Sequence, residues 1–445
     1  MGPGVAHVYR YAGASALAKG SLYLATSGGA EPSPFFFSGS LVHPKLTADL
    51  LRGLSRIVGA RFFIPPGMLA TILANADPVV TSGGGMLRFE GFSACASAHA
   101  RVDLAPGSYD ADVLRSGTTN VDFSPPMRAA LASVRDSERV RLDVGADRIT
   151  LEREGASIVE RKVKLPVRWL RSFVEVQAYQ ARMTPRFTLV GTEVLRFLRS
   201  LPRAKTSRHS IFIVPAGRGV RMSVTACKGA LATSGVERLR VLEDIAPFAK
   251  SLTAYGDVDG QASAFEVDFG AMRYTLTLSE TVWRGFSGEG QALLGLARGV
   301  DKGLVAKARA ALKWQSELRA RDLGATLGAS EEDATRGLAT LGTRGLVGFD
   351  LAKGAYFHRE MPFDLEQVEA LQPRLIAAKK LVAEGGVERK GGDETWVRGS
   401  DVVHRVRLED GEARCTCPWF AKHGATRGPC KHVLAAEMTS EGGDA

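Results

Sequence analysis

The chain carries, near its C-terminus, a short segment in which metal-binding side chains are unusually dense. Residues 415–432 read CTCPWFAKHGATRGPCKH and hold three of the five cysteines in the 445-residue sequence. Cys415 and Cys417 form a Cys-x-Cys pair, and Cys430 and His432 follow after twelve intervening residues. Three thiolates and one imidazole make the closed set of four ligands that is typical of a structural zinc site. The spacing therefore predicts one zinc ion with no open position for a catalytic water.

Other interpretations of this cluster stay open at this point. His423 lies in the intervening loop and could replace one of the four ligands. A chance grouping of buried thiols is the simplest alternative. A redox dithiol is disfavoured, because Cys-x-Cys differs from the Cys-x-x-Cys spacing of thioredoxin-type centres.

The sequence around the cluster predicts a small unit that depends on its metal. Residues 394–415 read as strands with Asp410-Gly411 as a hairpin turn, and KHVLAAEM begins a helix. Pro418 should end the last strand after the cysteine pair, while Cys430 and His432 should sit in the first turn of the helix. We expect almost no hydrophobic core here, so that folding requires the zinc.

The pattern C-x-C-x12-C-x-H, with aromatics after the second cysteine, resembles the SWIM zinc finger over residues 394–440. The resemblance implies that Cys415, Cys417, Cys430 and His432 are the zinc ligands. It also implies a role in DNA binding or in protein–protein contacts. Arg427 and Lys431 are candidate phosphate contacts, although they could equally balance the negative charge of the zinc–thiolate centre.

A second feature is a strongly basic segment. Residues 161–221 contain fourteen Lys or Arg against two acids, a surplus of twelve, whereas the whole chain has a net charge of +10. A solvated surface explains many such runs. A surface for nucleic acid or for an acidic partner is the alternative. The candidate nucleic-acid contacts in this segment are Arg168, Arg171, Arg196, Arg199, Arg203, Lys205 and Arg208.

The body of the chain reads as four copies of one unit within residues 61–280, each with a helix of about ten residues followed by alternating strands. Two copies enter the helix through Phe-x-Pro-Pro, at 63–66 and 123–126. In the strands, apolar and polar residues alternate, which predicts one buried and one solvated face. The fourth helix is expected within ERLRVLEDIAPFAKSL. The pattern predicts an α+β fold with helices on one face of antiparallel sheets.

This order of elements resembles the half-domains of DNA sliding clamps. The resemblance implies two clamp-like modules, at residues 61–175 and 186–290, after an N-terminal extension with a hairpin and a helix at 1–60. Clamps line their inner surface with basic helices, and only part of that pattern occurs here. Arg196 and Arg199 share a helical face, but the expected first helix has no basic residue. A closed ring around DNA is therefore not expected.

Residues 298–362 read as three helices and a hairpin with Lys353-Gly354 at its tip, an order that resembles the winged helix-turn-helix family. Ser330 is the expected N-cap of the third helix, which Asp333 would support through a capping box. That helix begins with Glu331, Glu332 and Asp333, which phosphate would repel. A role in protein contacts or as a spacer is therefore favoured over direct DNA binding. A helix and linker, 364–393, lead to the finger.

Composition narrows the possible functions. No run approaches ~18 uninterrupted apolar residues, and the N-terminus lacks the pattern of a secretory signal. Few and clustered cysteines suit a reducing cytoplasm. No catalytic triad, phosphate loop or dinucleotide fingerprint is present in the sequence. We therefore expect a non-enzymatic protein that binds nucleic acid, in the first place DNA, or alternatively an adaptor that docks a protein partner such as a cytoplasmic ATPase. The oligomeric state stays open.

Overall fold

A computed structural model describes residues 16–18, 21–23, 35–63, 78–120, 123–153, 156–161, 167–203, 210–287, 290, 293, 297, 302–361, 372–399, 402–409, 412–424 and 427–440. The chain forms two compact units. Unit 1 comprises 1–165, 186–254 and 264–277, and unit 2 comprises 166–185, 255–263 and 278–445. Helices and antiparallel strands occur together, so the α+β class is confirmed. The finer division into six segments stays a prediction.

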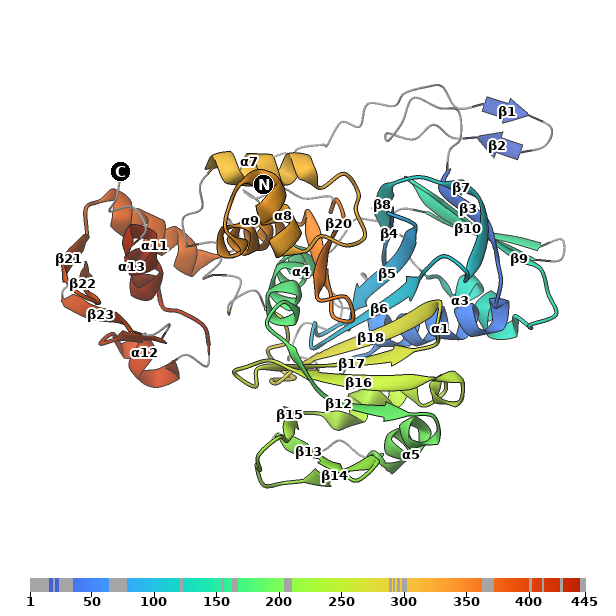
Figure 1. Ribbon diagram of the computed structural model, residues 1–445, viewed down its shortest axis with the longest axis horizontal. Coiled ribbons are helices and arrows are strands. Elements are labelled where there is room, and N and C mark those ends of the chain that lie inside the picture. Colours follow the sequence, from blue (N-terminus) through green and yellow to red (C-terminus); the bar gives the residue numbers. More distant parts are fainter. Residues whose placement is uncertain are drawn as a thin grey trace. The chain divides into compact units, whose positions relative to one another are not determined.

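An eight-stranded sheet is the largest element of the fold (Figure 1), in the order β12-β16-β17-β18-β6-β5-β4-β8. Its strands are β4 (Val79–Gly83), β5 (Met86–Phe92), β6 (Ala98–Leu104), β8 (Gly117–Asn120), β12 (Thr184–Val190), β16 (Ser251–Gly256), β17 (Ala262–Asp268) and β18 (Met272–Ser279). Apolar side chains of β5 and β6 alternate along each strand, and Leu87, Phe89 and Val102 are fully buried. On one face of the sheet, these side chains form part of the hydrophobic core of unit 1.

Two smaller sheets complete unit 1. One is five-stranded, in the order β11-β10-β9-β3-β7, with β3 (Phe35–Leu41), β7 (Tyr109–Leu114), β9 (Val140–Gly145), β10 (Arg148–Arg153) and β11 (Ala156–Arg161). The other has the order β14-β13-β15, with β13 (Ile211–Ala216), β14 (Gly219–Ser223) and β15 (Leu231–Thr233). Two short strands, β1 (Ala16–Ala18) and β2 (Ser21–Tyr23), pair with each other.

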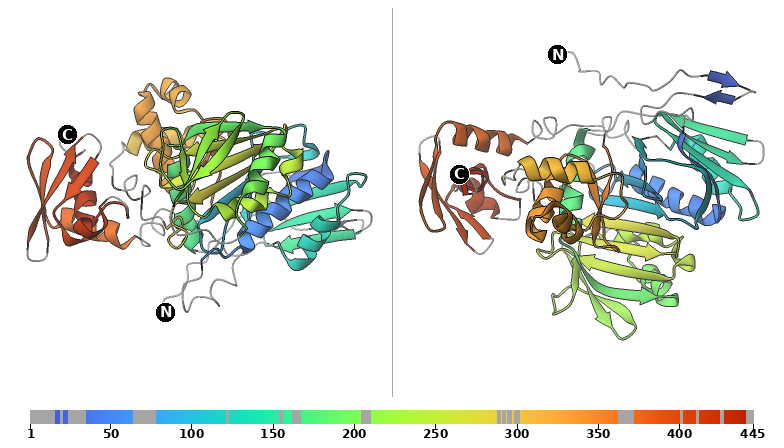
Figure 2. Two further views of the ribbon diagram at one scale, coloured as in Figure 1. Left: turned by 90° about the horizontal axis from the view of Figure 1, so that it is seen from below. Right: turned by 45° about the horizontal axis from the view of Figure 1, so that its top comes forward.

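A row of helices runs through unit 1: α3 (Pro125–Ser133), α1 (Pro44–Gly59), the 3-10 helix η1 (Val236–Leu242) and α5 (Thr192–Ser200). Helix α1 contacts both α3 and η1, and η1 contacts α5. Helix α1 also packs on β5 and β6, and Figure 2 (left) shows this blue helix lying along the sheet. The row is therefore continuous and covers the apolar side of the strands.

The predicted repeat holds in part. The helix of the first copy falls mostly on residues 64–77, outside the described residues, and α1 lies before it. The second copy is confirmed, since Ser124 caps α3 and Pro125 and Pro126 occupy its first turn. The third copy is confirmed as β12, α5 and the β13–β14 hairpin. The fourth helix is wrong: the segment forms η1 and a second 3-10 turn, η2 (Ala246–Phe248). Pro247 explains the break, because it lacks an N–H and would clash with the preceding helical turn.

The expectation of a solvated polar face is also wrong for the large sheet. Asp103 on β6 is 1% exposed and forms ion pairs with three arginines. The N–O distances are 3.1 Å to Arg88, 3.0 Å to Arg101 and 3.3 Å to Arg273. Glu266 on β17, which is 5% exposed, lies 3.8 Å from Arg273. These charges pair with one another, which is what allows them to be buried.

Unit 2 contains the three helices and hairpin expected from the sequence. They are α7 (Lys302–Ala311), α8 (Ala320–Leu327), α9 (Glu331–Thr343), β19 (Val347–Asp350) and β20 (Ala355–His358). Ser330 accepts a hydrogen bond from the Asp333 amide and so caps α9, while Gly328 ends α8 in the left-handed conformation. Helix α4 (Val167–Gln180) packs against α9 and β19. Assignment to the winged-helix family remains a prediction.

The C-terminal part of unit 2 is a four-stranded sheet, in the order β21-β22-β23-β24, with three helices. The strands are β21 (Val387–Gly391), β22 (Glu394–Arg398), β23 (Val403–Glu409) and β24 (Glu412–Cys415). The helices are α11 (Pro373–Ala383), α12 (Pro418–His423) and α13 (Lys431–Ser440). Figure 2 shows these red elements together, with α11 and α13 beside the sheet. Among the described residues, no helix is long and apolar enough to cross a membrane.

Candidate metal centre

The end of β24 positions the first two cysteines. Strand β24 pairs with β23, so that Cys415 lies opposite Val406. Thr416 extends this pairing, because its amide donates to the Arg405 carbonyl and its hydroxyl accepts from the Arg405 amide. Side chains alternate along an extended chain. Cys415 and Cys417 are accordingly buried on one side, whereas Thr416 is exposed on the other.

Two helix N-termini hold the other parts of the site. The Cys417 thiol accepts from the Phe420 amide at 3.3 Å and caps α12. The Cys430 thiol accepts from the Val433 amide at 3.4 Å, at the start of α13. A helix N-terminus stabilises negative charge, and each amide hydrogen bond acts to lower the pKa of its thiol. Burial nevertheless raises the pKa of Cys417 overall. Pro418 and Pro429 flank these starts, and Pro418 is a preferred first helical residue.

The four predicted ligands come together in one buried cluster. Their ligand atoms all lie within 4.8 Å of one another, and the Cys415 sulfur lies 3.9 Å from Nδ1 of His432. A zinc tetrahedron with bonds of about 2.3 Å to sulfur and about 2.0 Å to nitrogen needs roughly 3.5–3.8 Å between ligand atoms. The four side chains are therefore positioned to bind one zinc ion. Because the protein supplies all four ligands, the ion is structural.

Proton sharing within the cluster also favours metal binding. Hydrogen bonding from Cys415, aided by His432, lowers the pKa of Cys430 to about 4 despite burial. The same hydrogen bond, together with burial, raises the pKa of Cys415. One thiolate is thus available in the cluster at neutral pH, and a bound cation supplies the charge that the remaining thiolates need.

The prediction of a finger with almost no core is wrong. The three cysteine ligands belong to a hydrophobic cluster that includes Val397 and Val406 from the sheet, Val433 and Leu434 from α13, and Leu375 and Ala378 from α11. Leu293 and Ala297 complete the same cluster. Helix α11 and strand β21 were expected in a separate linker, yet they pack with the finger. The core comes from residues far outside the motif.

Arg374 on α11 is a further residue of the site that the sequence did not indicate. Its Nη1 donates to the carbonyls of Arg427 at 2.9 Å and Pro429 at 2.7 Å, in the loop just before Cys430. Its guanidinium also lies over the Trp419 ring at 4.8 Å from the centroid. Arg374 thereby ties the loop between the ligand pairs to α11. An arginine some forty residues before the cysteines belongs to no local pattern, so no sequence signal pointed to it.

His423 lies outside the cluster. Its ring contacts that of Trp419 with a centroid distance of 5.1 Å and an interplanar angle of 57°. The ligand group found among the described residues consists of the three cysteines and His432 alone. His404 instead lies close to the site, with its ring 4.4 Å from that of His432.

The structure divides the basic segment between the two units. Helix α4 belongs to unit 2, and Arg171 on it is half-buried, while the side chain of Arg168 lies outside the description. Arg196, Arg199 and Arg203 are exposed in unit 1. Lys205 and Arg208 fall in the undescribed range 204–209. In the finger, Arg427 is exposed and Lys431 is half-buried.

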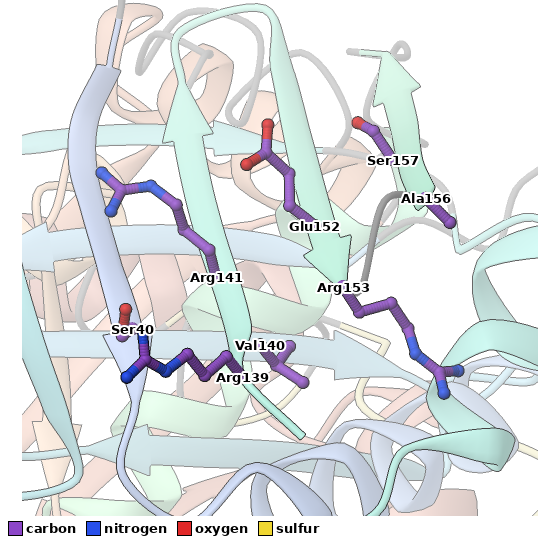
Figure 3. Close-up of a pocket in the computed structure, with 8 residues that line it drawn as sticks. All are labelled: Ser40, Arg139, Val140, Arg141, Glu152, Arg153, Ala156 and Ser157. Carbon is purple, nitrogen blue, oxygen red and sulfur yellow. The ribbon is translucent and has the colours of Figure 1, made fainter.

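A shallow pocket of about 410 Å³ lies on the five-stranded sheet of unit 1. Figure 3 shows Arg139 and Arg141 projecting toward β3, while Arg153 points away from them. Arg141 is paired with Asp112 and Asp143, and Arg153 with Glu138. Two of the three arginines that line this pocket are therefore already neutralised.

Comparison with known proteins agrees with the finger. Residues 404–440 match the SWIM zinc finger family, and this segment contains all four ligands. No curated protein matches the chain significantly.

Among solved structures, the chain is similar to proliferating cellular nuclear antigen from Entamoeba histolytica, with a TM-score of 0.36 and 12% identity, covering 55% of this chain and 98% of that one. It is also similar to A. fulgidus PCNA bound to the C-terminal region of FEN-1, with a TM-score of 0.37 and 11% identity, covering 55% of this chain and 97% of that one.

Proposed function

We propose that this protein is a non-enzymatic, zinc-binding protein of the cytoplasm that associates with nucleic acid, in the first place DNA. The observation that supports the proposal best is a group of exposed arginines around α5 and the β13–β14 hairpin. These are Arg186, Arg196, Arg199, Arg203, Arg218 and Arg221. The zinc finger provides a second binding site for nucleic acid, and two linked weak sites give a higher combined affinity than either site alone.

The arginines of this group come from neighbouring elements. Glu193 on α5 lies against the β13–β14 hairpin. A Cβ atom added to Gly219 of this hairpin would lie 3.2 Å from a carboxylate oxygen of Glu193. Glu193 pairs with Arg196 at 2.6 Å, yet the Arg196 side chain remains 74% exposed. The other five arginines form no ion pair with any residue that the structure describes. Guanidinium groups without an ion pair suit phosphate.

Helix α1 gives a useful contrast within the same row of helices. Its basic residues are already neutralised: Lys45 and Arg52 pair with Asp49, and Arg56 pairs with Asp244. Phosphate contact there would first require these ion pairs to open. We therefore place the nucleic-acid contact at α5 and the hairpin, and not at α1.

We expect a triple variant, Arg196→Gln with Arg199→Gln and Arg203→Gln, to weaken binding most at low salt. Each lost phosphate contact should lower the slope of log affinity against log salt by about 0.9 for duplex DNA, so the slope should fall by roughly 3. The measurement is fluorescence anisotropy of a labelled duplex and a labelled single strand across a salt series.

The matched control removes three exposed arginines elsewhere in unit 1, Arg128, Arg135 and Arg139. It changes the net charge equally and should leave most of the slope intact. An equal loss in both triple variants would mean that binding follows net charge and not this surface. A flat salt response of the unmodified protein would reject nucleic-acid association.

A second candidate function is that of an adaptor for a protein partner, and the first turn of α9 favours it. Glu331 and Glu332 are exposed and pair with no other described residue, whereas Asp333 pairs with Arg336 at 2.5 Å. Two free carboxylates at this position suit a basic protein surface.

Replacing Glu331 and Glu332 with lysine should abolish capture of such a partner from nuclease-treated lysate, while the same change at exposed Asp110 and Asp136 should not. If the lysine pair instead strengthens DNA binding several-fold and no nuclease-resistant partner is captured, the three-helix segment faces nucleic acid.

A further inference from the structure

The outer face of the finger sheet carries an exposed aromatic residue among charged side chains. Trp396 on β22 is 40% exposed, whereas its neighbours Thr395 and Val397 are 5% and 0% exposed. Residues next to each other on a strand point to opposite faces. Trp396 therefore lies on the face of the sheet opposite to the hydrophobic core and to the zinc ligands. It also lies outside residues 404–440, which match the SWIM family.

The Trp396 ring is held in a fixed orientation. Its Nε1 donates to Glu394 at 2.7 Å, and the ammonium of Lys390 lies 4.7 Å from the ring centroid. This hydrogen bond, with further contributions from Arg407 and Arg405, keeps the pKa of Glu394 below its usual value, so the acceptor is charged. A fixed aromatic side chain loses little conformational entropy when a flat group stacks on it.

Two arginines beside Trp396 differ from the other charged residues of this face. Arg405 lies directly opposite Trp396 in the β22–β23 register, and Arg398 is two residues further along β22 on the same face. Neither forms an ion pair with another part of the chain that the structure describes, and both are exposed. By contrast, Arg407 pairs with Glu394 at 3.3 Å, and Arg414 pairs with Glu412 at 3.5 Å.

We propose that Trp396, Arg398 and Arg405 form a binding platform for single-stranded nucleic acid, with a base stacked on the indole and phosphates at the two guanidinium groups. An aromatic ring beside unpaired basic side chains is the arrangement by which proteins bind single strands without sequence preference. In a duplex the faces of the bases are already stacked, so an isolated indole gains little there. This inference rests on the proposed association with nucleic acid and names its partner at the finger.

The test is the affinity of the full-length, zinc-loaded protein for a labelled oligodeoxythymidylate of about 20 nucleotides. Trp396→Ala should weaken this binding by about 5- to 150-fold, the range for loss of one stacked base, and Trp396→Phe should restore most of the affinity. Arg398→Gln and Arg405→Gln should each lower the salt slope by about 0.7. Zinc content should stay unchanged in all four variants, because the platform faces away from the ligands.

Trp283→Ala is the matched control, since Trp283 is also exposed, at 49%, but lies outside the finger. It should change the affinity by less than about twofold. The inference is overturned if Trp396→Ala binds the single strand as well as the unmodified protein does, or if it loses duplex and single-strand affinity equally. Unchanged single-strand binding by Trp396→Ala, in a protein whose duplex binding is salt-sensitive, would overturn the platform alone. Failure to bind any nucleic acid would overturn the proposed function as well.

Discussion

Cys430→Ala should reduce the zinc content of the purified protein from one ion per chain to near zero and unfold the finger. Cys430 is 2% exposed and closes the ligand cluster at the start of α13. A structural zinc contributes an apparent free energy of about 10–16 kcal/mol in zinc-finger peptides near pH 7. Loss of one ligand removes most of that contribution. Metal analysis after gel filtration, with limited proteolysis, would measure the effect.

The same variant tests how far the larger core supports the finger. Because α11, Leu293 and Ala297 extend the hydrophobic cluster, we expect new cleavage sites throughout residues 372–440 and none in unit 1. Two controls are available: Cys227→Ala removes an exposed thiol, and His423→Ala removes the loop histidine. Both should retain stoichiometric zinc. A Cys430→Ala protein that still holds one zinc ion, or a chelated protein with unchanged protease resistance, would contradict the assignment.

Asp103→Ala should be the most destabilising single change in unit 1. It would leave Arg88, Arg101 and Arg273 without their shared carboxylate, and the first two are at most 3% exposed. Breaking a buried ion pair by removing one partner costs about 3–5 kcal/mol. For a unit of this size the melting temperature should fall by roughly 6–20 °C. Calorimetry or thermal unfolding followed by circular dichroism would show it.

Asp112→Ala is the control for this prediction. Asp112 also pairs with an arginine, Arg141, but its side chain is 68% exposed. A surface ion pair contributes at most about 1 kcal/mol, so the control should unfold near the temperature of the unmodified protein. If Asp103→Ala does not fold at all, Asp103→Asn, which keeps the hydrogen-bonding shape, should show a smaller loss. Equal stability of the Asp103→Ala and Asp112→Ala proteins would show that the buried network contributes little.

The zinc ligands could be predicted from the sequence because their geometry is local. The pairs Cys415–Cys417 and Cys430–His432 each lie within three residues at the end of a strand or the start of a helix, so spacing alone fixes their approach. The N-cap of α9 and the proline entry of α3 are local in the same sense, and both are confirmed.

What the sequence could not indicate depends on long-range packing. The alternation in β6 and β17 is real, yet Asp103 and Glu266 are buried on the polar side, because burial depends on what covers the sheet and not on the strand itself. Arg374 and Leu375 join the finger from outside the motif. The prediction of a fourth helix is wrong for a local reason that is visible in the sequence, namely Pro247.

The connectivity of the two units has a practical consequence for dissecting this protein. The chain passes from one unit to the other five times, between 165 and 166, 185 and 186, 254 and 255, 263 and 264, and 277 and 278. No single cut can therefore liberate either unit as an intact fragment. A truncation near residue 278 would remove the helix and strand on which α4 packs, and would uncover the fully buried Phe173, whose ring lies 4.7 Å from the Arg359 guanidinium. Such fragments should aggregate, and assigning activities by deletion would mistake misfolding for lost function.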